Sequence, residues 1–481
     1  MTWRARLHGV LTADLRSLAL LRVALAGIVL ADVVLRWRDL AMFYSDRGVL
    51  PRDAYLAGVG EGWSWSLHLV SGAWQVQALL FALTAAAALL MLVGWHTRAA
   101  TVATWVLVCS VQQRNPLLVQ GGDILLRVVL FWGIFLPLGA RASVDRARAA
   151  PGDREPARVL SAGTVALLVQ LVLVYWMTAL WKDGPEWRSD GSALYYALHI
   201  DAYASGLGKW LRGYPGALVV LTHVVFWFEV LGPGLLLSPW RTGPLRTLAI
   251  LGFFVLHLGV LLCLDLGLFP FISALTMVGL LPSWFWDQLW PRLGARVAAV
   301  ERWLAARLAR SPGRTGPPAR LPRWAHVLCA ACLMYVTWWN LADLPGSPLG
   351  FPEPARGIGR ALHLEQRWDL FAPAPMRDDG WIVIPARLRD GREVDLLRGG
   401  APLSWQPPAR RTYRNQRWRR YLMSLVAPAH RGYRAHYARH LCGSFPDATS
   451  LELVFMRERT MPPGQPPVVT RVTLWRERCR D

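Results

Sequence analysis

The chain has 481 residues, of which 54% are hydrophobic and only 18% are charged. This balance is unusual for a soluble protein and typical of a membrane protein with several spans. The formal net charge of +21 would favour nucleic-acid binding in a soluble protein, but the long apolar segments argue against that function class. We therefore expect a lipid bilayer as partner and no nucleic acid. The 26 tryptophans agree with a bilayer, because indole rings concentrate at membrane interfaces.

Apolar segments recur along the first 345 residues. A helix needs roughly 20 mostly apolar residues to cross a bilayer, and about nine segments come near that length. The first lacks the small-residue cleavage pattern of a signal peptide, so we expect it to remain as a transmembrane helix. The predicted spans are, roughly, 16–36, 73–95, 98–114, 121–140, 159–182, 215–238, 245–264, 266–286 and 324–343.

The charges of the predicted loops predict an orientation. With the N-terminus in the cytoplasm, the inside loops include the arginine-rich segments 141–158 and 287–323. The outside loops hold fewer basic residues, and these are offset by acidic ones such as Asp183 and Glu186. This is the positive-inside pattern, and it favours an odd number of spans. The C-terminal region is then extracytoplasmic.

Three regions follow from these patterns. Residues 1–345 are predicted to form a transmembrane helical domain. Within it, residues 287–323 predict a cytoplasmic basic amphipathic helix on the inner leaflet, followed by a Pro/Gly linker over 311–322; a solvated linker helix is the alternative. Residues 350–481 predict a small extracytoplasmic domain. The expected fold class is a polytopic α-helical membrane bundle with a small C-terminal extracytoplasmic α+β domain.

The C-terminal region has the alternating patterns of a small sheet. Residues 381–397 predict two strands joined by a turn at Asp390-Gly391, and residues 451–460 and 467–478 predict two more. Two basic helices are predicted between these pairs of strands. Cys442 and Cys479 would face an oxidising compartment, where a disulfide or two free thiols would both be consistent with the sequence.

Ionisable side chains inside apolar spans are costly and mark a functional or a structural interior. Four of them are expected mainly to pair with one another and hold the bundle together: Arg22, Asp32, Asp123 and Arg127. Glu229 and His257 have no obvious partner in their own helices. For these two residues, a structural role and a catalytic role both remain open.

Lys182 ends the fifth predicted span, in the segment "YWMTALWKDGPEW". A lysine at the end of a span usually extends toward the lipid head groups. In a desolvated site, by contrast, burial disfavours the charged form of an amine, and a neutral amine can act as a base or nucleophile. Both interpretations fit the isolated segment.

Four long segments carry a family resemblance. They are "LRVALAGIVLADVVLRWRDLAMFYSDRGVLPR" (21–52), "QQRNPLLVQGGDILLRVVLFWGIFLPLGARASVD" (112–145), "FEVLGPGLLLSP" (228–239) and "RWDLFAPAPMRDDGWIVIPARLRDGREVDLL" (367–397). They resemble the HTTM domain, a bacterial membrane domain related to vitamin K-dependent γ-carboxylase. The resemblance covers nearly the whole chain, and it implies a location in the bacterial inner membrane.

Two shorter motifs resemble the carboxylase itself. Lys182 stands five residues before Trp187, as does the carboxylase lysine that is taken to deprotonate reduced vitamin K. The segment "HLGVLLCLDLGLFP" begins at His257 and is similar to a carboxylase segment with the same spacing. The resemblance implies a reduced quinone (vitamin K or menaquinone) as cofactor, with O2 and CO2 as co-reactants and no metal. It also implies the following site: Lys182, His257 and Glu229 as catalytic residues, with Trp187, Tyr196 and Asn115 at the quinone.

The chain departs from the carboxylase at two places. Pro116 follows Asn115 where the carboxylase has a histidine with a catalytic part, and Gly259, Val260 and Leu261 replace polar residues. The roughly 120 residues after the last span are also too few to match the large lumenal part of the carboxylase. These departures leave it open whether carboxylation is retained.

Two functions from different classes are therefore expected. In the first, Lys182 takes a proton from a reduced quinone, and reaction with oxygen then drives the modification of a secreted peptide. In the second, the protein is a non-catalytic membrane factor for the maturation or export of a secreted peptide or toxin. A transporter has less support, because the sequence shows no inverted repeat.

Overall fold

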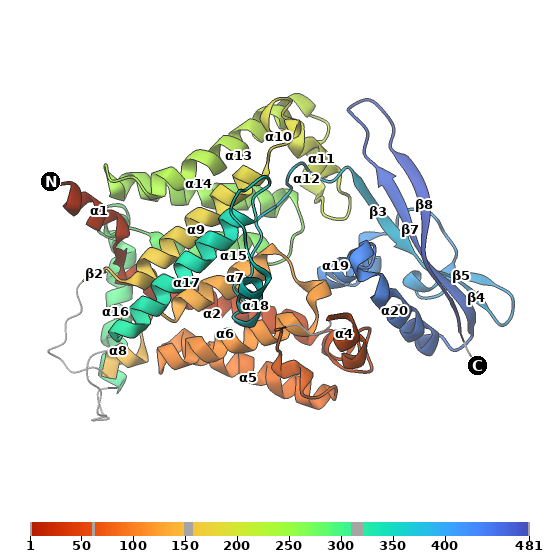
Figure 1. Ribbon diagram of the computed structural model, residues 1–481, viewed down its shortest axis with the longest axis horizontal. Helices are drawn as coiled ribbons and strands as arrows, with labels where there is room; N and C mark the ends of the chain where they lie inside the picture. Colours follow the sequence, from red (N-terminus) through yellow and green to blue (C-terminus); the bar gives the residue numbers. More distant parts are fainter. Residues whose placement is uncertain (1, 60–62, 149–156, 309–320, 480–481) are drawn as a thin grey trace.

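The computed structural model describes residues 2–59, 63–148, 157–308 and 321–479. It is mostly helical, with a bundle of long helices and a small β-sheet domain at one end (Figure 1). Within these residues, six helices are long and apolar enough to cross a bilayer, so the protein is a multi-pass membrane protein. These six are α2 (Leu15–Trp37), α5 (Trp74–Val93), α9 (Ala162–Trp181), α13 (Pro215–Leu236), α14 (Thr242–Cys263) and α17 (Arg323–Ala342).

The other three predicted spans are helical, but they fall short of the length or apolarity of a span. The helix α6 (Thr97–Arg114) has the length, yet polar and basic residues occupy both of its ends. The helix α7 (Gly121–Gly133) has 13 residues. The helix α15 (Phe269–Thr276) has eight residues and continues only as a 3₁₀ turn, η3 (Met277–Leu280). Nearly every side chain of α7 is buried, so this short helix lies at the centre of the bundle.

One end of the bundle, here called the N-terminal end, gathers segments that are distant in sequence. The short strand β1 (Ala13–Asp14) pairs with β2 (Arg158–Val159) just before α2 and α9 begin. Ser17 donates to the carbonyl of Leu281, which follows η3. The Asp145 carboxylate accepts from the hydroxyl of Thr97 at 2.6 Å, which joins the start of α6 to the segment after α7.

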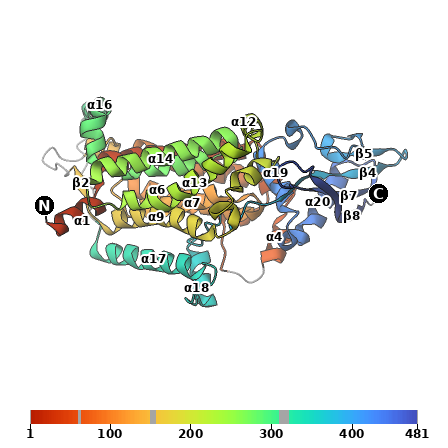
Figure 2. The ribbon, with the colours of Figure 1, turned by 90° about the horizontal axis from the view of Figure 1, so that it is seen from above.

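The opposite end, here called the C-terminal end, carries the β-sheet domain (Figures 1 and 2). Trp37, Lys182 and Leu264 lie at or just beyond the ends of α2, α9 and α14 here. The chain therefore passes from the N-terminal end to the C-terminal end along α2, α9 and α14. Shorter helices complete the bundle: α1 (Trp3–Leu11), α3 (Leu40–Tyr44), α4 (Arg52–Val59), α8 (Val144–Arg148), α10 (Pro185–Arg188), α11 (Ala193–His199), α12 (Gly206–Leu211) and α18 (Glu353–Ala361).

The C-terminal domain is built on one antiparallel sheet, as the strand patterns predict. The longest strand, β7 (Ala448–Arg459), pairs with β8 (Val468–Arg478) along one edge. Along its other edge it pairs with β3 (Asp378–Val383) and then with β4 (Pro385–Leu388). The predicted turn at Asp390-Gly391 joins β4 to β5 (Glu393–Asp395), and β6 (Ala401–Pro402) extends the sheet from there. Gly391 has a φ of 86°, which explains why glycine occupies this turn.

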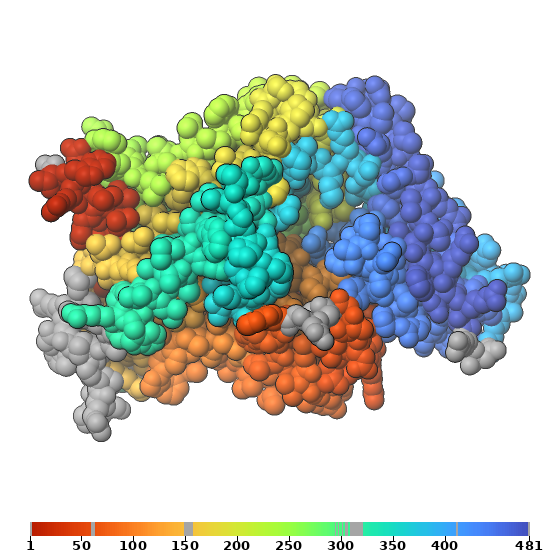
Figure 3. Space-filling view, viewed as in Figure 1, coloured from red at the N-terminus to blue at the C-terminus, as the bar shows by residue number. Residues whose placement is uncertain are grey.

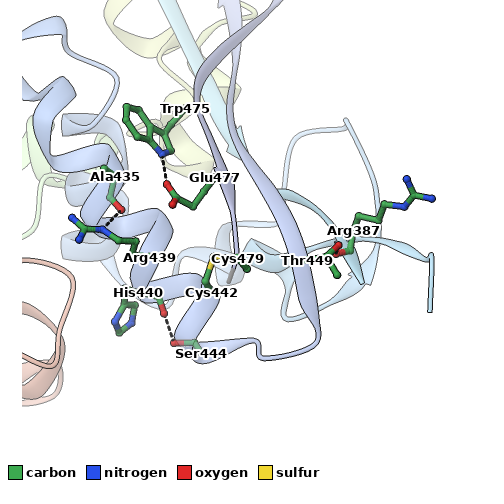
Figure 4. The surroundings of a disulfide bond; sticks show 10 residues. All are labelled: Arg387, Ala435, Arg439, His440, Cys442, Ser444, Thr449, Trp475, Glu477 and Cys479. Atoms are coloured by element: carbon green, nitrogen blue, oxygen red, sulfur yellow. Dashed lines mark hydrogen bonds between the residues drawn. A yellow bond between two sulfur atoms is a disulfide. The ribbon is translucent and has the colours of Figure 1, made fainter. Parts of the chain in front are cut away.

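Two basic helices, α19 (Gln416–Ser424) and α20 (Arg431–Ser444), lie between the sheet and the bundle, where the sequence predicts them. Cys442 of α20 and Cys479 after β8 form a disulfide, which decides between the two alternatives for these cysteines (Figure 4). Trp418 of α19 packs on Phe43 with a ring-centroid distance of 4.7 Å and donates to the Asp39 carboxylate. The domain is thereby docked against the loop that follows α2, and no gap separates the two in the space-filling view (Figure 3).

A helix also forms within the predicted basic segment 287–323. This helix, α16 (Pro291–Leu308), lies at the N-terminal end of the bundle (Figure 2). Most of the Pro/Gly linker predicted over 311–322 lies outside the described residues, which end at 308 and resume at 321.

Candidate functional site

Lys182 is a buried, paired residue at the C-terminal end of the bundle. It caps the C-terminus of α9, and its side chain is only 3% exposed. Its Nζ donates to the Oε2 of Glu229, which comes from the middle of α13. The side chain therefore does not extend to the head groups. The structure instead brings two of the three predicted catalytic residues into direct contact.

Trp187 covers this pair. The Lys182 Nζ lies 4.0 Å from the centroid of the Trp187 ring, which is a cation–π geometry. The indole N–H of Trp187 donates to the carbonyl of Phe371 at 2.9 Å, so the ring has a fixed position. The five-residue spacing between Lys182 and Trp187 is therefore a real spatial relation in this fold.

The cover over Lys182 is built by two distant parts of the chain. Gly184 donates its N–H to the carbonyl of Pro373 at 3.2 Å. Pro373 belongs to the segment that leads into the C-terminal domain. From the other side, the Arg188 guanidinium donates to the backbone carbonyl of Lys182 at 3.0 Å. Around the indole, Trp187, Ala193 and Phe226 form a small apolar cluster with Phe371 packed against it. The ion pair consequently lies in a largely dry environment.

Tyr196 contacts a neighbouring ion pair and not the lysine. The Arg377 guanidinium lies 4.5 Å from the centroid of the Tyr196 ring. The same guanidinium pairs with the buried carboxylate of Glu186 at 2.7 Å, and this hydrogen bond raises the pKa of Arg377. Sequence reasoning missed Glu186 and Arg377 as a pair, because they are far apart along the chain.

His257 belongs to a second pair, deeper in the bundle. One of its ring nitrogens, Nε2, lies 2.7 Å from the hydroxyl of Tyr175. Its other nitrogen, Nδ1, is buried and has no hydrogen-bond partner among the described residues. Tyr175 and Lys182 are seven residues apart on α9, which is two turns, or about 10 Å along the helix axis. His257 is thus near the site without touching Lys182.

Asn115 contacts a different part of the molecule. Its side-chain amide donates to the carbonyl of Phe43 at 3.1 Å, while its buried Oδ1 has no partner in the described part of the chain. None of its hydrogen bonds reaches Lys182, Glu229 or Trp187. The structure does not bring this predicted quinone-binding residue into the lysine site.

A second buried charge network involves a residue that the sequence analysis did not single out. Arg36 donates to Asp32 and to Asp123 at 2.6 Å each, and to the Tyr44 hydroxyl at 2.8 Å. Arg417, from α19, also pairs with Asp32. The spacing of Asp32 and Arg36, four residues apart on one helix, is a signal that could have identified their pairing.

The expectation that Arg22, Asp32, Asp123 and Arg127 pair with one another is wrong. Asp123 pairs with Arg36, and its carboxylate also caps the start of α7 by accepting from the N–H of Gln120. Arg127, one turn later, pairs with Glu365 at 2.8 Å instead. Arg22 lies at the N-terminal end of the bundle, where it donates to the carbonyls of Leu138, Arg141 and Ala142.

A cavity of about 200 Å³ lies beside the Arg36 network. Its lining includes Asp32, Asp123 and Arg417, together with the apolar side chains of Leu126 and Ile272. The Lys182 pair does not line it. Within the described residues, no three histidine, cysteine or acidic side chains form a group that could hold a metal ion.

The geometry at Lys182 suits proton transfer. A buried amine, a carboxylate in direct contact with it and a π face over the charge are the parts of a site where an ammonium can be held and discharged. Comparisons of the chain with protein-family models, with curated proteins and with solved structures find no match in any of the three.

Proposed function

We propose that the protein is a bacterial inner-membrane enzyme of the HTTM type, related to vitamin K-dependent γ-carboxylase, in which Lys182 acts as a base on a reduced quinone. The observation that carries this proposal is the buried contact between Lys182 and Glu229 beneath Trp187. The quinol would supply an acidic hydroxyl, and its oxidation by oxygen would supply a strong base that removes a proton from a secreted peptide. Incorporation of CO2 would be a further step that the missing histidine at Pro116 leaves open.

The ion pair explains how an amine next to a carboxylate could serve as a base. A proton that moves from the Lys182 Nζ to the Glu229 Oε2 leaves a neutral amine and a neutral acid, with no change in total charge. Trp187 favours the ammonium form and would hold the amine once it has taken a proton from the substrate.

The surroundings of Lys182 are compatible with an aromatic quinol ring. The cluster of Trp187, Ala193 and Phe226 provides apolar and aromatic contacts next to the amine. Trp187 and Phe226 would contact the ring, while Lys182 would receive its proton.

We further propose that all nine helices span the membrane, with the N-terminus in the cytoplasm and the C-terminal domain outside. The arginine-rich loops support this orientation through the positive-inside rule. The disulfide between Cys442 and Cys479 also supports it, because disulfides persist in oxidising compartments. In this orientation Lys182 lies near the outer face, where a secreted peptide would pass.

The proposal is tested by measuring quinone epoxide after purified protein in detergent is mixed with reduced menaquinone or vitamin K and oxygen. We expect epoxide from the wild type and a loss of roughly 10²–10⁴-fold in Lys182→Ala, because a positioned base contributes about this much. Lys209→Ala is a matched control, since Lys209 is the only other lysine and is exposed. Equal signals from wild type and Lys182→Ala would sink the proposed role of Lys182.

The second candidate is a non-catalytic membrane factor for the maturation or export of a secreted peptide. The same contacts are also consistent with this function. Trp187 and Gly184, which follow Lys182, donate to the segment that leads into the C-terminal domain. In that case the Lys182 pair would only hold the two parts together. Lys182→Met combined with Glu229→Met would then support peptide export as well as the wild type does.

A further inference from the structure

We propose that the N-terminal end of the bundle carries a binding site for the phosphate group of an anionic phospholipid. A cavity of about 630 Å³ lies there between α1, the loop from α13 to α14, and residues 282–284. This volume is in the range of sites that hold small molecules. The site is at the opposite end from Lys182 and does not depend on the function proposed above.

The lining of this cavity is strongly basic. Four arginines and one acidic residue contribute to it: Arg6, Arg158, Arg241, Arg246 and Asp14. The single carboxylate, that of Asp14, already accepts from Arg16 at 2.8 Å and from the Ser283 hydroxyl at 2.7 Å. The cavity therefore has a positive balance that its own acidic residue does not neutralise.

Two of these arginine side chains form hydrogen bonds within the protein, and the other two are available to bind a ligand. Arg246 is buried and donates to the carbonyls of Val10 and Leu236. Arg158 donates to the Ser283 hydroxyl at 2.8 Å. The side chains of Arg6 and Arg241, by contrast, have no hydrogen bond or ion pair to any residue that the structure describes. They are the cations that a ligand phosphate would neutralise.

The start of α14 adds backbone donors to these cations. Thr242 and Gly243 are its first two residues, and both line the cavity. The first N–H groups of a helix have no partner within the helix, and no side chain caps them here. A helix N-terminus of this kind favours anions, phosphate in particular. Gly243 is needed for the shape of the site, because a Cβ at this position would lie 2.5 Å from the Cβ of Trp284.

Tryptophans at the cavity favour a lipid as the source of the phosphate. Trp240 lines the cavity, is 59% exposed and lies 6.1 Å, centroid to centroid, from the equally exposed ring of Trp3. Exposed indoles at a helix end of a membrane protein lie at the depth of the lipid head groups. A basic pocket between membrane helices at that depth matches the phosphate of an anionic lipid.

The test is native mass spectrometry of the full-length protein in equal amounts of phosphatidylglycerol and phosphatidylethanolamine. We expect the wild type to retain phosphatidylglycerol preferentially, and the double variant Arg6→Gln/Arg241→Gln to retain it about tenfold less. The control is Arg4→Gln/Arg292→Gln, which removes two exposed arginines of the same end that do not line the cavity. This control should bind like the wild type.

A second variant fills the cavity without changing its charge. Gly9 lines the cavity, and a Cβ at this position would have no atom within 4 Å, so Gly9→Phe adds bulk at the cavity wall. It should also lose phosphatidylglycerol. If both the double variant and Gly9→Phe retain phosphatidylglycerol as the wild type does, the proposal is overturned.

A third arm identifies the source of the phosphate. Thermal unfolding is compared with inorganic phosphate and with a short-chain phosphatidylglycerol at the same concentration. Stabilisation by the lipid alone, lost in Arg6→Gln/Arg241→Gln, supports a lipid site. Equal stabilisation by inorganic phosphate, lost in the same variant, assigns the site to free phosphate and overturns the choice of a lipid. No stabilisation by either overturns the site.

Discussion

The two ends of the bundle differ in how many of their cations meet a carboxylate. At the C-terminal end, buried cations meet carboxylates: Lys182 meets Glu229, Arg36 meets Asp32 and Asp123, and Arg127 meets Glu365. At the N-terminal end, Arg16 pairs with Asp14 and Asp287, but Arg22 and Arg246 donate to backbone carbonyls. The side chains of Arg6 and Arg241 have no partner among the described residues.

This difference indicates which end can bind external anions and which can exchange protons. A cation that is paired with a carboxylate inside the protein contributes little to binding an external anion. In the Lys182–Glu229 pair the lysine can also exchange a proton with its partner, whereas the arginines stay protonated. A cation that is held by carbonyls or by nothing keeps its full attraction for anions. The C-terminal end is therefore suited to chemistry, and the N-terminal end is suited to an anionic membrane surface.

The largest effect should come from breaking the Lys182 pair. Lys182→Met leaves the Glu229 carboxylate buried without its cation, and loss of one partner of a buried pair costs about 3–5 kcal/mol. Lys182→Met/Glu229→Met should recover most of this loss, because no lone charge remains. Thermal unfolding of the full-length protein in detergent measures both. A double variant as unstable as the single one would show that the pair is not a local unit.

The same comparison can be made at the N-terminal end. The buried Lys182 pair is expected to be costly to break, whereas Arg6→Gln/Arg241→Gln should change the midpoint of thermal unfolding little in the absence of lipid. A large loss of stability in this double variant would mean that Arg6 and Arg241 have internal roles, and it would weaken the contrast between the ends.

An effect smaller than that of breaking the Lys182 pair is expected from Asp379, which joins the C-terminal domain to the loop after α11. Its carboxylate is buried and accepts from the N–H of Ala202, and burial raises its pKa to about 6. Because the folded-state pKa exceeds the unfolded value of about 3.9, folding favours the protonated form. Stability should therefore fall as the pH rises from about 4 to about 6.

Asp379→Asn should remove this pH dependence. Above about pH 7 the variant should be more stable than the wild type by roughly 2 kcal/mol, and below about pH 4 the two should be alike. The midpoint of thermal unfolding, measured between pH 4 and 8, tests this effect. Asp378→Asn, at the adjacent exposed residue, is the control. Parallel pH profiles of Asp379→Asn and wild type would contradict the assignment.

Much of the fold follows from local sequence patterns. Six of the nine predicted spans meet the length and apolarity of a membrane helix, because continuous apolar segments are a local signal. The helices α6, α7 and α15 were harder to predict as spans, since α7 and α15 are short and depend on burial inside the bundle. The turn at Asp390-Gly391 and the long strands of the sheet were also readable, because turn residues and alternation are local.

The site was predicted only in part. The Lys182–Trp187 spacing and the isolated Glu229 indicated three residues that do meet in space. Asn115 was included through the resemblance alone, and the structure brings it against Phe43. Phe371, Arg377 and Arg417 were missed because they reach Trp187, Glu186 and Asp32 across 184, 191 and 385 residues. No local pattern encodes such contacts.

Both proposals depend on the two ends facing opposite sides of the membrane. The most direct measurement is labelling of intact spheroplasts with a membrane-impermeant maleimide, using single cysteines introduced by Asp390→Cys in the exposed β4–β5 turn and Arg292→Cys in α16. We predict that the cysteine at 390 is labelled without lysis, and the cysteine at 292 only after lysis. The wild type gives the background. Labelling of the cysteine at 292 in intact spheroplasts, with protection of that at 390, would contradict the account.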